Sequence, residues 1–124
     1  MNVRIPKDEN FEYEKCKNLY LKNQLLVNDD ADFDYVINKT FFYSFYKKNM
    51  LSGCAYLYFK NKKLFLNGFS VRKSFVFNIL IIKTICKWFT CNIYAESIQK
   101  PAILLLLRCG FKKLKNNIYV YYND

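Results

Sequence analysis

One short segment near the C-terminus constrains the fold more than any other. The stretch "KPAILLLLRCGFKK", Lys100 to Lys113, places Pro101 in the first helical turn, where its missing N–H costs nothing. Gly110 stands where a helix can end in a left-handed residue, and Phe111 begins an extended segment. The aliphatic run 103–107 covers more than one helical face. We therefore expect a helix buried on most sides and followed directly by a strand.

Local patterns elsewhere predict short strands and helices in a mixed order. Two alternating strands over residues 53–71 share a tight turn at Asn61 and Lys62 and have a bulge or splay at Asn67-Gly68. Residues 74–89 predict a mostly buried helix with Ser74 as its N-cap. The other expected elements are a strand over 2–5, helices over 13–23 and 33–37, strands over 40–49 and 91–97, and a hairpin over 111–122 that turns at Asn116 and Asn117.

This order predicts the fold class and the number of domains. We expect one α/β or α+β domain over residues 1–124, with a central mixed, mainly antiparallel sheet and helices on both faces. A hydrophobic fraction of 52% over 124 residues is typical of a packed globular protein. The longest apolar stretches, 75–82 and 103–107, are too short to span a bilayer. With no apolar signal region in the first ten residues, a cytoplasmic protein without a membrane partner is expected.

Cysteine spacing and the absence of histidine exclude several chemistries. The five cysteines are irregularly spaced and include no CxxC pair, so we expect no metal site and no disulfide framework. Buried, reduced thiols are the better interpretation. Without histidine, Ser–His–Asp and Cys–His catalysis are excluded, and no standard nucleotide-binding glycine loop is present.

A formal charge of +10 suggests nucleic acid as a partner, but the composition argues against it. Only three of the 20 basic residues are arginine, the residue better suited to reading phosphates and bases. The chain is also rich in Lys, Asn, Ile, Phe and Tyr, which AT-rich codons encode. A solvated basic surface is therefore expected, and nucleic acid is not expected as a partner.

The element order carries a family resemblance. Closed by "IYAES", "KPAILLLLRCGFKKL" and "NNIYVYY", it resembles the GNAT acyltransferase family, in which a strand, a helix ending in Gly-Phe and a hairpin form the C-terminal half. The segment 53–73 looks like the family's central hairpin, with Val71 at the end of its second strand. The resemblance extends from about Asn2 to Tyr122. Short members without the family's glycine-rich turn resemble acetyltransferase-like proteins of phages and mobile elements.

The resemblance implies acetyl-coenzyme A as co-substrate, held where two neighbouring parallel strands splay apart. In the family, backbone groups of the strand before the long helix bind pantetheine, and a glycine-rich turn offers N–H groups to the pyrophosphate. Here that turn contains no glycine, so side-chain charge would replace part of the backbone cradle. The resemblance implies that the coenzyme is bound by Phe69, Ser70, Val71, Arg72, Lys73 and Ser74.

The implied reaction is direct attack of an amine on a thioester, which needs a base and a proton donor but no covalent nucleophile. Glu96 is the candidate base, and Tyr94 and Ser97 are candidate donors. A capping role for Glu96, and packing or capping roles for the other two, stay open. Many members carry a Tyr acid four residues before the Gly of Gly-Phe, where this chain has Leu106.

Three functions remain open from the sequence. The first is an N-acyltransferase that moves an acetyl group from acetyl-coenzyme A to an amine on a small molecule or a protein. The second is a GNAT-like protein without catalysis, acting as a protein-binding or virion-associated module. The third is a small basic nucleic-acid-binding protein, with Tyr and Phe stacking among lysines. The oligomeric state is open, a homodimer included.

Overall fold

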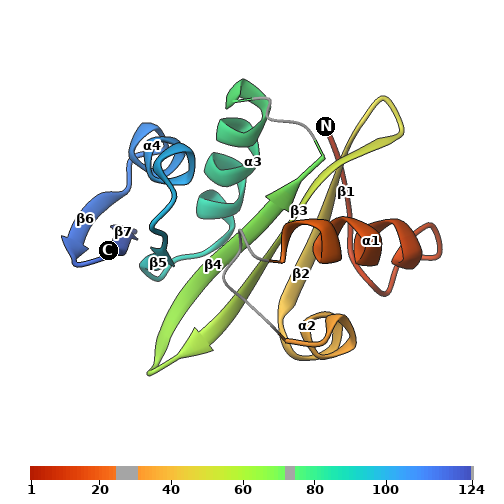
Figure 1. The fold of residues 1–124 in the computed structure, drawn as a ribbon, viewed down its shortest axis with the longest axis horizontal. Coiled ribbons are helices and arrows are strands. Elements are labelled where there is room, and N and C mark those ends of the chain that lie inside the picture. The colour runs from red at the N-terminus through yellow and green to blue at the C-terminus, as the bar shows by residue number, and fades with distance from the viewer. Residues whose placement is uncertain (25–30, 72–74, 124) are drawn as a thin grey trace. The chain divides into compact units, whose positions relative to one another are not determined.

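The chain folds into strands and helices in the order that the sequence predicts (Figure 1). The structure, a computed structural model, describes residues 1–24, 31–71 and 75–123. Its elements are β1 (Asn2–Arg4), α1 (Tyr13–Asn23), α2 (Phe33–Lys39), β2 (Phe41–Lys47), β3 (Met50–Lys60), β4 (Lys63–Ser70), α3 (Phe75–Trp88), β5 (Ile93–Glu96), α4 (Lys100–Arg108), β6 (Lys112–Lys115) and β7 (Ile118–Tyr121). None of the described helices has the length and apolar character needed to cross a membrane.

The strands form one seven-stranded sheet in the order β1-β2-β3-β4-β5-β7-β6. The pair β4–β5 is parallel, whereas β1–β2, β2–β3, β5–β7 and β6–β7 are antiparallel. The predicted α+β class with a mixed, mainly antiparallel sheet is therefore confirmed.

The chain divides into two compact units. Unit 1 contains Met1–Tyr58 and Asn67–Arg72, and unit 2 contains Phe59–Leu66 and Lys73–Asp124. Strands β3 and β4 therefore contribute residues to each unit. A single domain over residues 1–124 stays a prediction.

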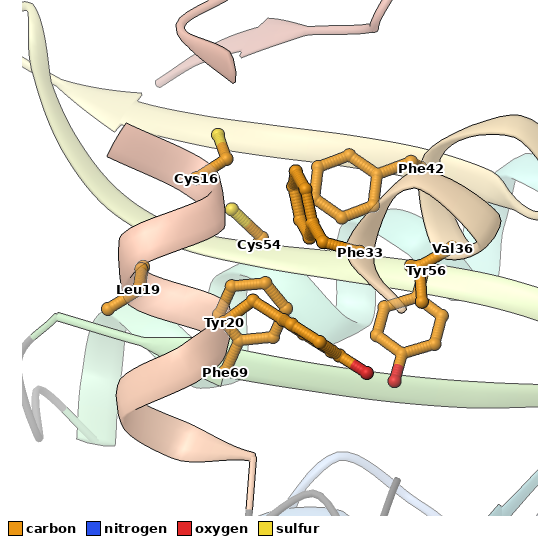
Figure 2. Close-up of a cluster of buried hydrophobic side chains, with 9 residues drawn as sticks. All are labelled: Cys16, Leu19, Tyr20, Phe33, Val36, Phe42, Cys54, Tyr56 and Phe69. Atoms are coloured by element: carbon orange, nitrogen blue, oxygen red, sulfur yellow. The ribbon is translucent and has the colours of Figure 1, made fainter. Parts of the chain in front are cut away.

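An aromatic core holds unit 1 together. Helix α1 buries Cys16, Leu19 and Tyr20, which share one face because they are three and four residues apart. Phe33 of α2 packs edge-on against the Phe42 ring at 5.7 Å between ring centroids and tilts against the Tyr20 ring at 5.5 Å. Figure 2 shows these rings meeting the side chains of β2, β3 and β4. The buried cluster comprises Cys16, Leu19, Tyr20, Phe33, Val36, Phe42, Cys54, Tyr56 and Phe69.

The hairpin turns use left-handed residues other than glycine. Asn61 and Lys62 have φ values of 53° and 65°, which matches a type I′ turn and confirms the turn predicted there. Strand β4 continues through Asn67 and Gly68, so the two residues do not end the strand, and the expected bulge or splay there stays a prediction. At this position the Gly68 N–H donates a hydrogen bond to Asn67 Oδ1 at 2.9 Å.

Helices α3 and α4 are less buried than their apolar sequences suggest. In α3 only Ile81, Ile85 and Cys86 are buried, and in α4 only Leu106 is buried. Val76 is 79% exposed, and the expectation of mostly buried helices was therefore wrong. An apolar run around a helix does not reveal how much of its circumference other elements cover. The predicted Ser74 cap lies outside the described residues.

Four of the five cysteines are buried as expected. Cys16, Cys54, Cys86 and Cys109 lie in the interior as free thiols. Cys91 is a free thiol too, but it is exposed, so burial was wrong for this residue. It lies in the connection between α3 and β5, where the chain leaves the helix.

The C-terminal end of α4 is closed by main-chain hydrogen bonds. The Gly110 N–H donates to the Leu107 carbonyl at 3.1 Å, and the Phe111 N–H donates to the Leu106 carbonyl at 3.0 Å. Gly110 has a φ of +100°, which confirms the predicted left-handed helix end.

Gly110→Val should lower the free energy of unfolding by about 1–3 kcal/mol, because a β-branched residue is strained at this φ. A Cβ atom at Gly110 would lie 3.4 Å from Tyr121 Cε2, so backbone torsion rather than a clash causes the loss. Urea unfolding measures it. Lys113→Val at an exposed strand position is the control, and equal stability of the two variants would contradict the prediction.

Candidate functional site

Strand β5 places two of the predicted catalytic residues on one face. Ile93 and Ala95 are buried. Because side chains alternate along a strand, Tyr94 and Glu96 lie together on the opposite face. Their Cα atoms are roughly 7 Å apart at two strand steps. The Glu96 side chain is exposed, as a base that must meet a substrate has to be.

Tyr94 lies in an aromatic and basic environment. In register it lies opposite Phe65 of β4, and the two ring centroids are 5.7 Å apart. Lys63 Nζ lies 5.2 Å from the centroid of the Tyr94 ring, within the range of a cation–π interaction. Sequence reasoning missed Lys63. Lys63 and Phe65 are two residues apart, so they share one face of the strand, but the parallel pairing of β4 with β5 is not a local signal.

Ser97 stabilises the turn between β5 and α4. Its N–H donates to the Asn117 carbonyl at 2.9 Å, and its Oγ accepts from the Gln99 N–H at 3.2 Å. This bonding agrees with the structural alternative for Ser97 and still leaves the hydroxyl proton available as a donor. Gln99 is the N-cap of α4 and makes no side-chain capping hydrogen bond.

Of the six residues predicted to bind the coenzyme, three lie among the residues that the structure describes and three do not. Phe69 contributes its ring to the unit 1 core and can offer a ligand only its main chain (Figure 2). The Val71 N–H donates to the Ser52 carbonyl at 2.9 Å, so it is not available to pantetheine. Ser70 is half-buried. Arg72, Lys73 and Ser74 lie outside the described residues.

The close approach of β3 to β4 depends on a glycine. A Cβ atom at Gly53 would lie 3.1 Å from the Phe69 carbonyl oxygen, tighter than ordinary contact. Gly53 therefore lets the main chain around Phe69 lie closely against β3. Sequence reasoning gave this glycine no role.

Two residues of the Gly-Phe segment contribute no acid or nucleophile. Leu106, in the position of the family's Tyr, is buried. Burial raises the pKa of the Cys109 thiol to about 11, and its Sγ lies 3.8 Å from the Ile79 carbonyl oxygen. Cys109 is therefore a neutral thiol packed against α3.

The side chains at the end of β5 and in the turn after it suit proton transfer. Within residues 1–24, 31–71 and 75–123, no group of three or more Cys, Asp or Glu side chains is placed to hold a metal ion. What β5 offers is a carboxylate and a phenol on one strand face, followed by a hydroxyl. Phe69, Ser70 and Val71 belong to unit 1, whereas Tyr94, Glu96 and Ser97 belong to unit 2.

Solved structures identify the fold. No protein-family model and no curated protein sequence matches the chain. The chain is similar to an N-acetyltransferase from Staphylococcus aureus Mu50, with a TM-score of 0.73, 14% identity and 99% of each chain covered. A probable acetyltransferase from Staphylococcus epidermidis gives 0.69 at 15% identity over 99% of each chain. A Bacillus subtilis acetyltransferase solved in complex with CoA gives 0.63 at 13% identity, covering 96% of this chain and 94% of the other. The resemblance drawn from the sequence is thus confirmed at the level of the fold: this chain has the fold of the GNAT acetyltransferases.

Proposed function

We propose that the protein is an N-acyltransferase that transfers an acetyl group from acetyl-coenzyme A to an amine. The supporting observation is that the Glu96 carboxylate and the Tyr94 phenol lie on one face of β5. This strand pairs in parallel with β4, and the fold is shared with acetyltransferases. Fold likeness alone does not choose a function, so the proposal rests on these side chains.

The reaction removes two protons from the acceptor ammonium group and supplies one to the thiolate. Acetyl-coenzyme A brings the acetyl group as a thioester. Glu96 takes a proton from the acceptor ammonium group, which leaves the neutral amine able to form the new C–N bond as the C–S bond breaks. The Tyr94 or Ser97 hydroxyl donates a proton to the departing thiolate. It regains a proton from the nitrogen, which loses a second proton as the amide forms, and the proton on Glu96 passes to water. Leu106 offers no such proton, so this chain would rely on β5 and its following turn.

Coenzyme binding would combine main-chain groups of Phe69 and Ser70 with the positive charges of Arg72 and Lys73. Because the Val71 N–H is bonded to Ser52, less of the binding can come from the main chain than the sequence alone suggested. Charge-assisted hydrogen bonds to phosphate oxygens are stronger than neutral ones and weaken as salt is added.

Arg72→Ala combined with Lys73→Ala should weaken acetyl-coenzyme A binding at least about tenfold, because two charge-assisted contacts are lost. Isothermal titration calorimetry measures this, and added salt should weaken binding by the wild type. Lys22→Ala combined with Lys39→Ala removes the same charge from exposed positions of unit 1 and should leave the affinity unchanged.

The same titration tests the proposal as a whole. Absence of binding at millimolar acetyl-coenzyme A would refute the enzyme and favour a module without catalysis. That second candidate has one supporting observation, the exposed apolar side chains of α3 and α4, which include Val76, Leu80 and Leu107. Binding unaffected by the double variant would mean that the phosphates contact other residues.

A further inference from the structure

The positive charge of the protein is concentrated in one of its units. Unit 2 contains eleven of the 20 basic residues and two of the ten acidic residues, a formal charge of +9. Unit 1 contains nine basic and eight acidic residues, a formal charge of +1. All ten basic residues described in unit 2 are exposed, and Glu96 is the only acidic residue among the described part of that unit.

Codon composition does not produce this distribution. A bias towards Lys, Asn, Ile, Phe and Tyr acts on the whole chain, yet unit 1 matches its lysines with acids and unit 2 does not. Of the difference of eight charges between the units, six come from fewer carboxylates in unit 2 and two from more basic residues. Unit 2 thus contains few of the acidic residues that would repel a polyanion.

The basic residues of unit 2 lie on both sides of β5. One group lies at the β3–β4 hairpin, and the other covers β6, whose four residues are all exposed. In the sheet order β4-β5-β7-β6, three strand spacings separate β4 from β6, or roughly 14 Å. The two groups comprise Lys60, Lys62, Lys63, Lys112, Lys113 and Lys115.

The distance between β4 and β6 argues that these lysines do not all bind one coenzyme molecule. One pyrophosphate group is too short to reach both β4 and β6. A ligand that contacts both groups must carry repeated negative charge along its length. Lys83, Lys87, Lys100 and Arg108 on the helices add further exposed charge to the same unit.

Aromatic rings accompany the lysines of the hairpin. Lys60 Nζ lies 5.6 Å from the Phe65 ring centroid, and Lys63 Nζ lies 5.2 Å from that of Tyr94. Next to Lys60 in sequence, Phe59 is 66% exposed. Phe65 is buried and Tyr94 is half-buried, so Phe59 is the exposed ring of these three on which a base can stack. An exposed ring among lysines is a combination with which proteins bind single strands, because bases stack on the ring while lysines contact phosphates. Among polyanions, single-stranded nucleic acid is the one whose bases can stack on such a ring while its phosphates contact the lysines.

We propose that unit 2 binds single-stranded nucleic acid, through the β3–β4 hairpin residues Phe59–Lys63 and the lysines of β6. Composition alone led us to expect no nucleic-acid partner, and the distribution of charge between the units is what changes that expectation. The proposal does not depend on acetyl transfer. A protein without coenzyme affinity would carry the same surface.

Fluorescence anisotropy of the full-length protein with a labelled 20-nucleotide oligouridine tests the proposal. Affinity should fall as salt rises from 50 to 300 mM, with a slope of about −0.7 per phosphate contacted in a plot of log K against log salt. Lys112→Gln, Lys113→Gln and Lys115→Gln together should weaken binding at least about tenfold at 100 mM salt. They should also reduce the slope by about 2, the value for three phosphates.

The matched control removes the same charge from unit 1. Lys7→Gln, Lys22→Gln and Lys39→Gln together lie at exposed positions and should leave the affinity within about twofold. Equal losses in the two triple variants would overturn the proposal, because net charge alone would then explain binding. Lys60→Gln with Lys63→Gln provides a second test at the hairpin if the β6 variant fails to fold, as judged by circular dichroism.

Three further outcomes would overturn the proposal. They are no binding of the oligouridine at 50 mM salt, complete displacement of it by millimolar acetyl-coenzyme A, and equally tight binding to phosphatidylserine vesicles. Retention of the oligouridine in the presence of acetyl-coenzyme A supports a surface separate from the coenzyme site. Weaker binding by Phe59→Ala supports stacking.

Discussion

Glu96→Gln should lower kcat for acetyl transfer by about 10²–10⁴-fold, the usual contribution of a positioned general base. Glutamine keeps the size and hydrogen-bonding capacity of the side chain but cannot take the acceptor's proton. The exposed side chain stands at the end of β5, which is held by main-chain pairing with β7, so folding should be unaffected. Mass spectrometry of acetylated products from a panel of primary amines measures the rate.

A matched substitution separates chemistry from charge. Glu9→Gln removes a carboxylate from an exposed position in unit 1 and should leave kcat unchanged. Acetyl-coenzyme A affinity should be equal in the wild type and in Glu96→Gln, because the carboxylate acts on the acceptor. A kcat within twofold of wild type for Glu96→Gln would show that another group removes the proton.

Phe33→Ala should lower the free energy of unfolding by about 3–5 kcal/mol, the range for deleting a buried phenylalanine ring. Phe33 is 2% exposed, and its ring contacts Tyr13, Tyr20 and Phe42. Its removal leaves a cavity between α1, α2 and β2 that the surrounding rings fill only in part. Urea unfolding followed by circular dichroism measures the change.

The neighbouring helix position provides the control. Tyr35 lies two residues further along α2 and is 59% exposed. Tyr35→Ala removes an aromatic ring from the same helix without opening a cavity and should change stability by less than about 1 kcal/mol. Similar losses in the two variants would mean that helix propensity, rather than the aromatic core, determines the stability of this region.

The order of elements was predictable because its signals are local. Pro101 and Gly110 fix α4 within a residue or two, and Asn61-Lys62 fixes the central hairpin. The short helix α2 was predicted from only a few residues and is present. These signals depend on neighbours in sequence, so a single chain carries them without any knowledge of tertiary contacts.

Features that depend on distant segments were not predictable. Val76 and Leu80 look like core residues in the sequence, but no local pattern tells which side of α3 other elements cover. The approach of Lys63 to Tyr94 requires the parallel pairing of β4 with β5 across an intervening helix. The roles of Glu96, Tyr94 and Ser97 stay predictions, because strand position limits what they can reach but does not determine their chemistry.

Strand β6 has a consequence for the solution behaviour of the protein. It is the last strand in the sheet order, and three of its four residues are lysines. Lysine on an edge strand prevents the open backbone groups from pairing with a strand of another molecule. A polyanion that neutralises these lysines would remove that repulsion. The protein should therefore stay monodisperse most readily when such a polyanion is absent or in clear excess, and should self-associate near the polyanion concentration at which the charges cancel.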